Sequence, residues 1–182
     1  LAYAFRSRIA LLLGIANFVI AAIFWLIARY VDTEKTDSVL IVIGVIGVVL
    51  YAIGHLHTLR PAWEKFGEVY LFAGTLVTLS LVYVFTFDEP WRSIIDDGIE
   101  SYAAPPLVYV SLAVAAVLVA WQWAARPRDL ESNAEAGILA ALLAVAAVVS
   151  TWPAWTGYAV VFNAVFFAAA AGIVTRGYLR GD

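Results

Sequence analysis

The chain has 182 residues, of which 64% are hydrophobic and 14% charged, with a net charge of −3 and a mean hydropathy of +0.89. Soluble domains have about 45–50% apolar and about 25% charged residues, so this composition excludes an ordinary soluble domain, and its hydrophobicity also excludes a disordered chain. The absence of cysteine excludes a disulfide scaffold and thiolate metal sites. No basic surface suggests nucleic acid as a partner. The remaining class is an integral membrane protein, whose first partner is the lipid bilayer.

Six uncharged apolar runs follow one another along the chain, and each is close to the roughly 20 residues that a helix needs to cross a bilayer core. They cover residues 9–28, 38–56, 69–87, 107–125, 136–152 and 155–175. All six prolines fall between these runs, where the missing N–H does not interrupt a helix. We therefore predict an all-α, polytopic transmembrane helical bundle with six spans, forming one domain over residues 1–182.

Arginine and lysine are unevenly distributed over the connections between the runs. If the spans alternate in direction, eight of these residues lie on one side of the membrane and three on the other. The eight are Arg6, Arg8, Arg60, Lys65, Arg126, Arg128, Arg176 and Arg180. Because positively charged loops stay in the cytoplasm, we expect both ends of the chain to be cytoplasmic.

Two asparagines, Asn17 and Asn163, are the most polar side chains inside the predicted spans. An amide in hydrocarbon costs several kcal/mol unless it is hydrogen-bonded, so we expect each to face a neighbour, with Ser111, Thr75 and Thr78 as candidates. No ionisable residue accompanies them inside a span, which favours helix-to-helix hydrogen bonding. The alternative is an uncharged polar path lined by these five residues.

Small residues mark faces on which helices can approach closely. Gly44, Gly47 and Gly54 share one stripe of the second span, and Gly172 follows four alanines in the sixth. Membrane helices associate through such residues, and we expect packing within the chain rather than between subunits. The short connection 151–157 predicts that the fifth and sixth spans form an antiparallel hairpin and pack side by side.

The only histidines, His55 and His57, lie where the second span ends. Residues two apart on a helix point about 200° away from each other, so these two do not make a helical metal pair. A single histidine ligating a pigment or meeting Glu64 or Glu68 is an alternative, but we expect interfacial polar residues. We predict no catalytic residues, no metal site and no cofactor.

The outer connection between the third and fourth spans is the longest. Apolar residues recur within it at helical spacing, and the acidic residues point elsewhere, which predicts a short amphipathic helix on the membrane surface. If a partner docks from outside, we expect it here. The residues for this contact are Trp91, Ile95, Asp96, Asp97 and Glu100.

Several segments of the chain resemble a known family. The run HLHTLRPAWEKF at 55–66, Tyr70–Leu71 before a Gly74-led span, residues 163–172, and RGYLRGD at 176–182 together resemble predicted bacterial multispan membrane proteins of domain-of-unknown-function family 2157. The resemblance implies a piece of a longer chain of eight or more helices with a soluble N-terminal segment, located in the bacterial cytoplasmic membrane. It implies no activity and no functional residue.

These observations predict a non-enzymatic integral membrane protein, a structural, accessory or assembly subunit of a larger membrane complex with other membrane subunits as partners. The alternative is a transporter or channel for a small uncharged or lipid-like solute. A membrane enzyme acting on lipid head groups ranks last, because only the acidic residues of the outer connection would serve it.

Overall fold

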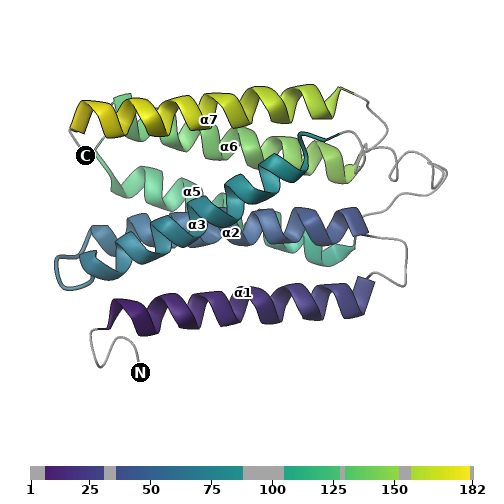
Figure 1. Ribbon diagram of the computed structural model, residues 1–182, viewed down its shortest axis with the longest axis horizontal. Coiled ribbons are helices and arrows are strands. Elements are labelled where there is room, and N and C mark those ends of the chain that lie inside the picture. Colours follow the sequence, from purple (N-terminus) through teal and green to yellow (C-terminus); the bar gives the residue numbers. More distant parts are fainter. Residues whose placement is uncertain (1–6, 31–35, 88–104, 128–129, 152–156, 181–182) are drawn as a thin grey trace.

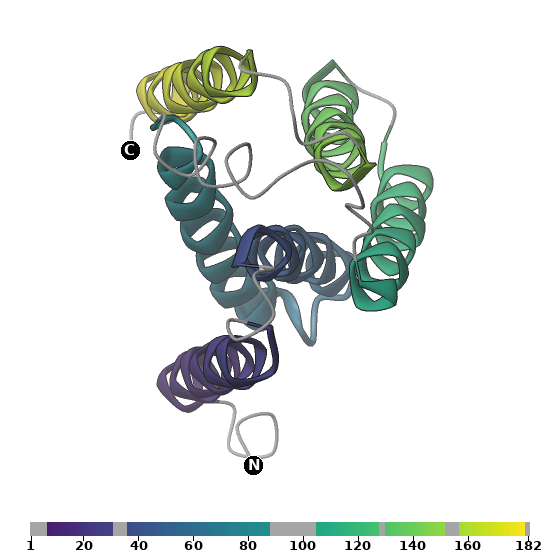
Figure 2. The same cartoon turned by 90° about the vertical axis from the view of Figure 1, so that its right-hand side faces the viewer.

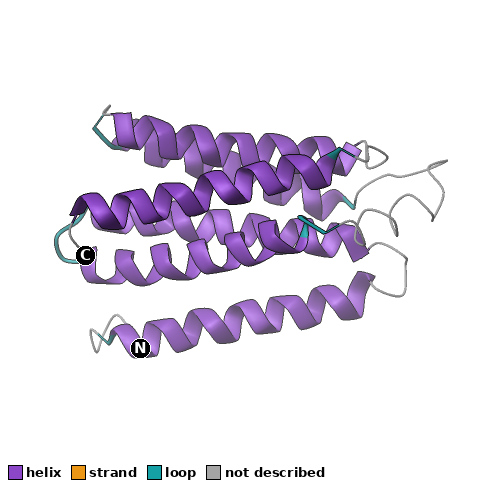
Figure 3. Cartoon of the chain, turned by 45° about the horizontal axis from the view of Figure 1, so that its top comes forward, coloured by secondary structure: helices purple, strands orange, loops and turns teal. Residues whose placement is uncertain are grey.

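The computed structural model describes residues 7–30, 36–87, 105–127, 130–151 and 157–180. Within these ranges the chain is helical, with short turns and no strand (Figure 3). The helices are α1 (Arg8–Tyr30), α2 (Thr36–Thr58), α3 (Glu64–Val84), α5 (Pro106–Ala125), α6 (Leu130–Thr151) and α7 (Tyr158–Arg180). The predicted all-helical architecture is confirmed.

Five of these helices, α1, α2, α3, α5 and α6, are long and apolar enough to cross a membrane. In α7 the qualifying apolar stretch, Tyr158–Ala171, is shorter. The prolines mark helix boundaries as predicted: Pro105 precedes the first turn of α5, Pro106 opens it, and Pro61 and Pro127 lie in connections. Proline fits the first turn because its missing N–H has no intrahelical partner there.

Two helices begin earlier than the hydropathy indicates. The predicted spans started at residues 69 and 136, whereas α3 begins at Glu64 and α6 at Leu130. Phe66 and Ser132, in these first turns, are both buried. These first turns therefore contribute residues to the packed bundle. The search for uncharged runs could not include them, because they contain charged residues.

The helices run roughly along one common direction, and α3 is inclined across α2 (Figure 1). Helix α2 is the centre of the bundle, with 56% of its apolar window buried, the largest share of any span. The main core combines Val45 and Ala52 of α2 with residues of the later helices, such as Ala115 of α5, Val149 of α6 and Phe162 of α7. Helices α1, α3, α5 and α6 pack against α2, and α7 lies farther from it, beside α3 (Figure 2).

Glycines from both helices line the interface between α2 and α3. A Cβ added to Gly54 would come within 2.8 Å of the backbone nitrogen of Leu71, and one added to Gly67 would come within 2.8 Å of the carbonyl oxygen of Gly54. A Cβ on Gly74 would collide with the backbone nitrogen of Tyr51 and lie 2.8 Å from the carbonyl oxygen of Gly47. Only glycine permits this backbone approach, so we call this interface the glycine seam.

The predicted packing glycines of α2 belong to this seam, where Gly44 faces the side chain of Leu81 and Gly47 faces Thr78. Their counterparts on α3, Gly67 and Gly74, were not predicted as packing residues. Gly172 is part of α7, but its surroundings lie outside what the structure describes.

Helix α7 does not pack along α6, which corrects the predicted side-by-side hairpin (Figure 2). It packs instead on α3, where the rings of Phe85 and Phe162 lie 5.0 Å apart and those of Tyr83 and Phe166 lie 5.7 Å apart. Aromatic pairs of this kind provide a large contact area. Helix α6 is rich in alanine and offers α7 less side-chain surface.

Candidate functional site

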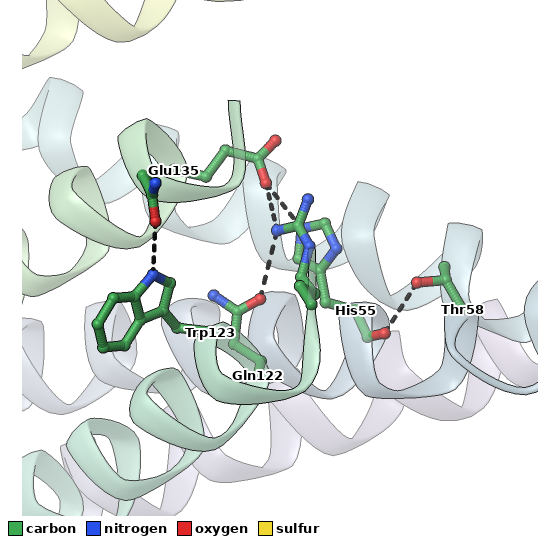
Figure 4. Close-up of polar contacts among 7 residues, drawn as sticks. His55, Thr58, Gln122, Trp123 and Glu135 are labelled. Carbon is green, nitrogen blue, oxygen red and sulfur yellow. Dashed lines mark hydrogen bonds and ion pairs between the residues drawn. The ribbon is translucent and has the colours of Figure 1, made fainter. Parts of the chain in front are cut away.

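Four polar side chains meet at one end of the bundle, where α2, α5 and α6 come together (Figure 4). Arg126 Nη1 lies 2.6 Å from Glu135 Oε2, and His55 Nε2 lies 3.3 Å from the same oxygen. Arg126 Nη1 also lies 3.5 Å from His55 Nε2 and 3.5 Å from Gln122 Oε1. We call His55, Gln122, Arg126 and Glu135 the charged cluster.

Most of the charged cluster is shielded from solvent. The side chains of His55, Arg126 and Glu135 are 7%, 13% and 14% exposed, and Gln122 is completely buried. Ionised groups removed from water are stable only when they are paired, and Glu135 supplies that pairing for Arg126. The Nε2 atom of Gln122 has no hydrogen-bond partner among the described atoms.

Local structure explains how these side chains reach one another. Arg126 directly follows the last residue of α5, where a cation interacts favourably with the helix dipole, and Gln122 lies four residues earlier on the same face. A bond from Trp123 Nε1 to Asn133 Oδ1, 2.8 Å long, joins the end of α5 to the start of α6. The packing of α6 on α5 brings Glu135 beside the end of α5.

The imidazole of His55 adapts to both of its charged neighbours. In the tautomer with a proton on Nε2, this atom donates a hydrogen bond to Glu135. In the other tautomer Nε2 accepts a hydrogen bond from Arg126, so only one of the two contacts forms at a time. The ring packs edge-on against Tyr51 at a centroid distance of 4.8 Å. The cluster therefore connects the ends of three helices, and its ionisable groups are directed at one another.

His57 has a different environment. Its Nδ1 lies 2.9 Å from the carbonyl oxygen of Ile53, and its ring lies 5.4 Å from that of Trp63 and 5.0 Å from that of Tyr70. The guanidinium of Arg60 sits 5.1 Å over Trp63. The two histidines point to separate neighbours, and the described part of the chain holds no group of three metal-ligating side chains.

His55 lies in the charged cluster and meets Glu135, which corrects the alternative of a contact with Glu64 or Glu68 for this histidine. The interfacial role expected of the two histidines stays a prediction. Gln122, Arg126 and Glu135 were not predicted as members of a site. One signal was present: Glu135 directly precedes the apolar run 136–152, where a carboxylate needs a partner.

Asn17 does not face a neighbouring helix, which corrects that prediction. It is exposed on α1, and its Nδ2 donates 2.9 Å to the carbonyl oxygen of Leu13 in the same helix. The reason is that α1 buries only Leu11, Ile15 and Leu26, which lie on a different side of the helix.

Asn163 does join two helices, but through a carbonyl group and not through the hydroxyls predicted. Its Nδ2 lies 3.0 Å from the carbonyl oxygen of Thr86, just after α3, and 2.8 Å from that of Ala159. Ser111 donates to Val108 within α5.

Thr75 and Thr78 are half-buried in α3, and Thr78 Oγ1 lies against Gly47 with no hydrogen-bond partner among the described atoms. The structure therefore does not bring together the five residues of the predicted polar path. The predicted outer docking residues, Trp91, Ile95, Asp96, Asp97 and Glu100, lie outside the described residues.

The fold defines a helical protein whose helices are compatible with a membrane. No family model, no curated protein and no solved structure matches the chain. The resemblance to family 2157 therefore stays a prediction.

Proposed function

We propose that this protein is a non-enzymatic, six-span subunit of the bacterial cytoplasmic membrane, with both ends in the cytoplasm, that assembles with other membrane helices through α1. The observation that carries the proposal is the exposed amide of Asn17. It lies near the middle of a 23-residue apolar helix, at the depth where a bilayer offers no hydrogen-bond partner.

The amide of Asn17 is only partly satisfied by its own helix. The bond to Leu13 uses one N–H group, which leaves a second N–H and the carbonyl oxygen without a partner among the described residues. Polar groups in hydrocarbon are costly unless a partner is present, and interhelical hydrogen bonds from asparagine hold membrane helices together. A helix from another subunit would supply that partner.

The surroundings of Asn17 suit a close helix contact. Gly14 and Ala21 lie three residues before it and four residues after it, on the same face, and both are exposed. A Cβ added to Gly14 would meet no atom within 4 Å, so this face is open. Helix α1 is held to the bundle on its other side, by Leu11 and Ile15 against α2 and α3 and by Leu26, which joins the main core.

Photo-crosslinking in native membranes tests this assignment. A photo-crosslinking amino acid at Ala21 should give a defined adduct with another membrane-spanning chain, while the same group at Ala16, which is exposed on another face of α1, should not. The variant Asn17→Leu should abolish the adduct, and Asn17→Gln should retain it because the amide is kept. Equal crosslinking from Ala21 and Ala16, or an adduct unaffected by Asn17→Leu, would overturn the proposal.

A second candidate function is the handling of a lipid-like solute. The observation that favours it is an apolar cavity of about 40 Å³ between α2, α3, α6 and α7. The scattered positions of Asn17, Thr75 and Ser111 do not favour a polar solute. Vesicles containing the protein would move a labelled lipid-like solute faster than empty vesicles if this function holds.

A further inference from the structure

A partly enclosed cavity of about 40 Å³ lies within the apolar part of the bundle. Its walls come from four helices, with Val45 on α2, Leu81 on α3, Leu142 and Ala146 on α6, and Phe162 on α7. This cavity is separate from the charged cluster and from the exposed face of α1. An inference from it therefore does not depend on the assembly role proposed for α1.

The cavity follows from the way in which α6 and α7 are placed. Helix α7 is held on α3 by its aromatic contacts and by the bond from Asn163 to Thr86, while α6 packs on α5 and α2. The two helices therefore stand apart although they are consecutive in the chain (Figure 2). Leu142 of α6 and Phe162 of α7 line the same cavity.

Water is a poor occupant for this cavity. A buried water needs two to four polar partners, and the lining has one polar side chain, Thr78. Its Oγ1 atom lies against Gly47, in the glycine seam, and is inaccessible. The cavity therefore presents hydrocarbon surface to whatever enters it.

A lipid headgroup is also a poor occupant. The lining carries no charged residue. On α6 the lining residue nearest in sequence to Glu135 is Leu142, seven residues later, which corresponds to about 10 Å along the helix. The bilayer core surrounds these helices if they span the membrane, and its hydrocarbon tails are apolar, flexible and present at high concentration. We propose that the cavity holds the end of a phospholipid acyl chain that inserts between α6 and α7.

Lipid photolabelling tests this site. The full-length protein is reconstituted in vesicles of a phospholipid that carries a diazirine near the end of one acyl chain, and the adducts are mapped by mass spectrometry. We expect adducts on Leu142, Ala146 or Phe162, in addition to those on lipid-facing residues such as Val110, which is exposed on α5. Wild-type protein labelled only on exposed residues would overturn the proposal.

Two tryptophan variants of α6, one that fills the cavity and one that does not, provide a matched comparison. Ala146→Trp should remove the adducts on Leu142 and Phe162, whereas Ala144→Trp, at an exposed position of the same helix, should leave them. Labelling of Val110 shows that the probe reaches each variant equally, and thermal unfolding followed by circular dichroism shows whether each variant is folded. Ala146→Leu, which adds less bulk, replaces the tryptophan if it is not. Cavity adducts that persist in a folded filled variant would contradict acyl-chain binding at this site.

Discussion

At the scale of single residues, the charged cluster contains an ion pair, between Arg126 and Glu135, that is largely shielded from solvent. Its exposed counterpart is the ion pair between Arg8 and Glu68, whose N···O distance is 2.9 Å and whose side chains are 50% and 56% exposed. Exposed pairs contribute little because water screens them. Removing one member of a buried pair is costly, because the other charge stays behind without a partner. The two pairs have similar chemistry and differ in burial.

The variant Glu135→Gln should lower the free energy of unfolding by about 3 kcal/mol, because Arg126 loses its counter-charge in a buried site. The matched control Glu68→Gln should lower it by less than about 1 kcal/mol. Unfolding by SDS titration from mild detergent micelles, followed by circular dichroism, measures both. Similar losses in the two variants would show that the charged cluster does not stabilise the helix ends.

At the scale of helices, the glycine seam sets how closely α2 and α3 approach. Gly54 and Gly67 each meet backbone atoms of the opposite helix, and backbone cannot move aside as a flexible side chain can. Close approach increases van der Waals contact, which drives association of helices in lipid because the tails are as apolar as the side chains. The seam is therefore the part of the bundle with the least tolerance for added volume.

The variant Gly74→Ala should destabilise the protein by about 2 kcal/mol. Its methyl group would collide with the backbone of Tyr51, and the helices would have to shift to make room for it. Gly137→Ala on α6 is the control, because a Cβ there meets nothing within 4 Å. Alanine favours a helix over glycine by up to about 1 kcal/mol, so the control should be neutral or more stable. Thermal unfolding in detergent ranks the two variants, and an equal response would argue against a tight seam.

At the scale of the whole molecule, the charge distribution predicts on which side of the membrane each helix end lies. Lys65 lies at the start of α3 and Phe87 just after its end, and both are exposed. Leu130, also exposed, opens α6. The proposed topology, which rests on the positive-inside pattern, predicts Lys65 and Leu130 in the cytoplasm and Phe87 outside. The absence of native cysteine makes this arrangement open to direct labelling.

Single-cysteine variants at these positions should react differently in intact cells. A membrane-impermeant maleimide should label Phe87→Cys directly, and Lys65→Cys and Leu130→Cys only after permeabilisation. The cysteine-free parent chain is the background control. Labelling of Lys65→Cys from outside, or equal labelling of all three variants in intact cells, would contradict the proposed topology.

The amino-acid sequence by itself determined where the helices are, because an uncharged run of bilayer length and the exclusion of proline are local properties. It also identified Gly47 and Gly54 as packing residues, since close approach requires a missing side chain. It did not identify Gly67 and Gly74 as packing residues. Their neighbours in the sequence are larger, and their role depends on the backbone of the opposite helix.

The tertiary structure alone decided which helices meet. His55 and Arg126 are 71 residues apart, and no local pattern links them to each other or to Glu135. The same holds for α7, which packs on α3 although α6 precedes it, and for Asn17, which faces outward. The helices are apolar on most sides, so hydropathy does not distinguish the face that packs from the face that meets lipid. That choice rests on shape and on a few polar bonds, and these exist only once the helices are assembled.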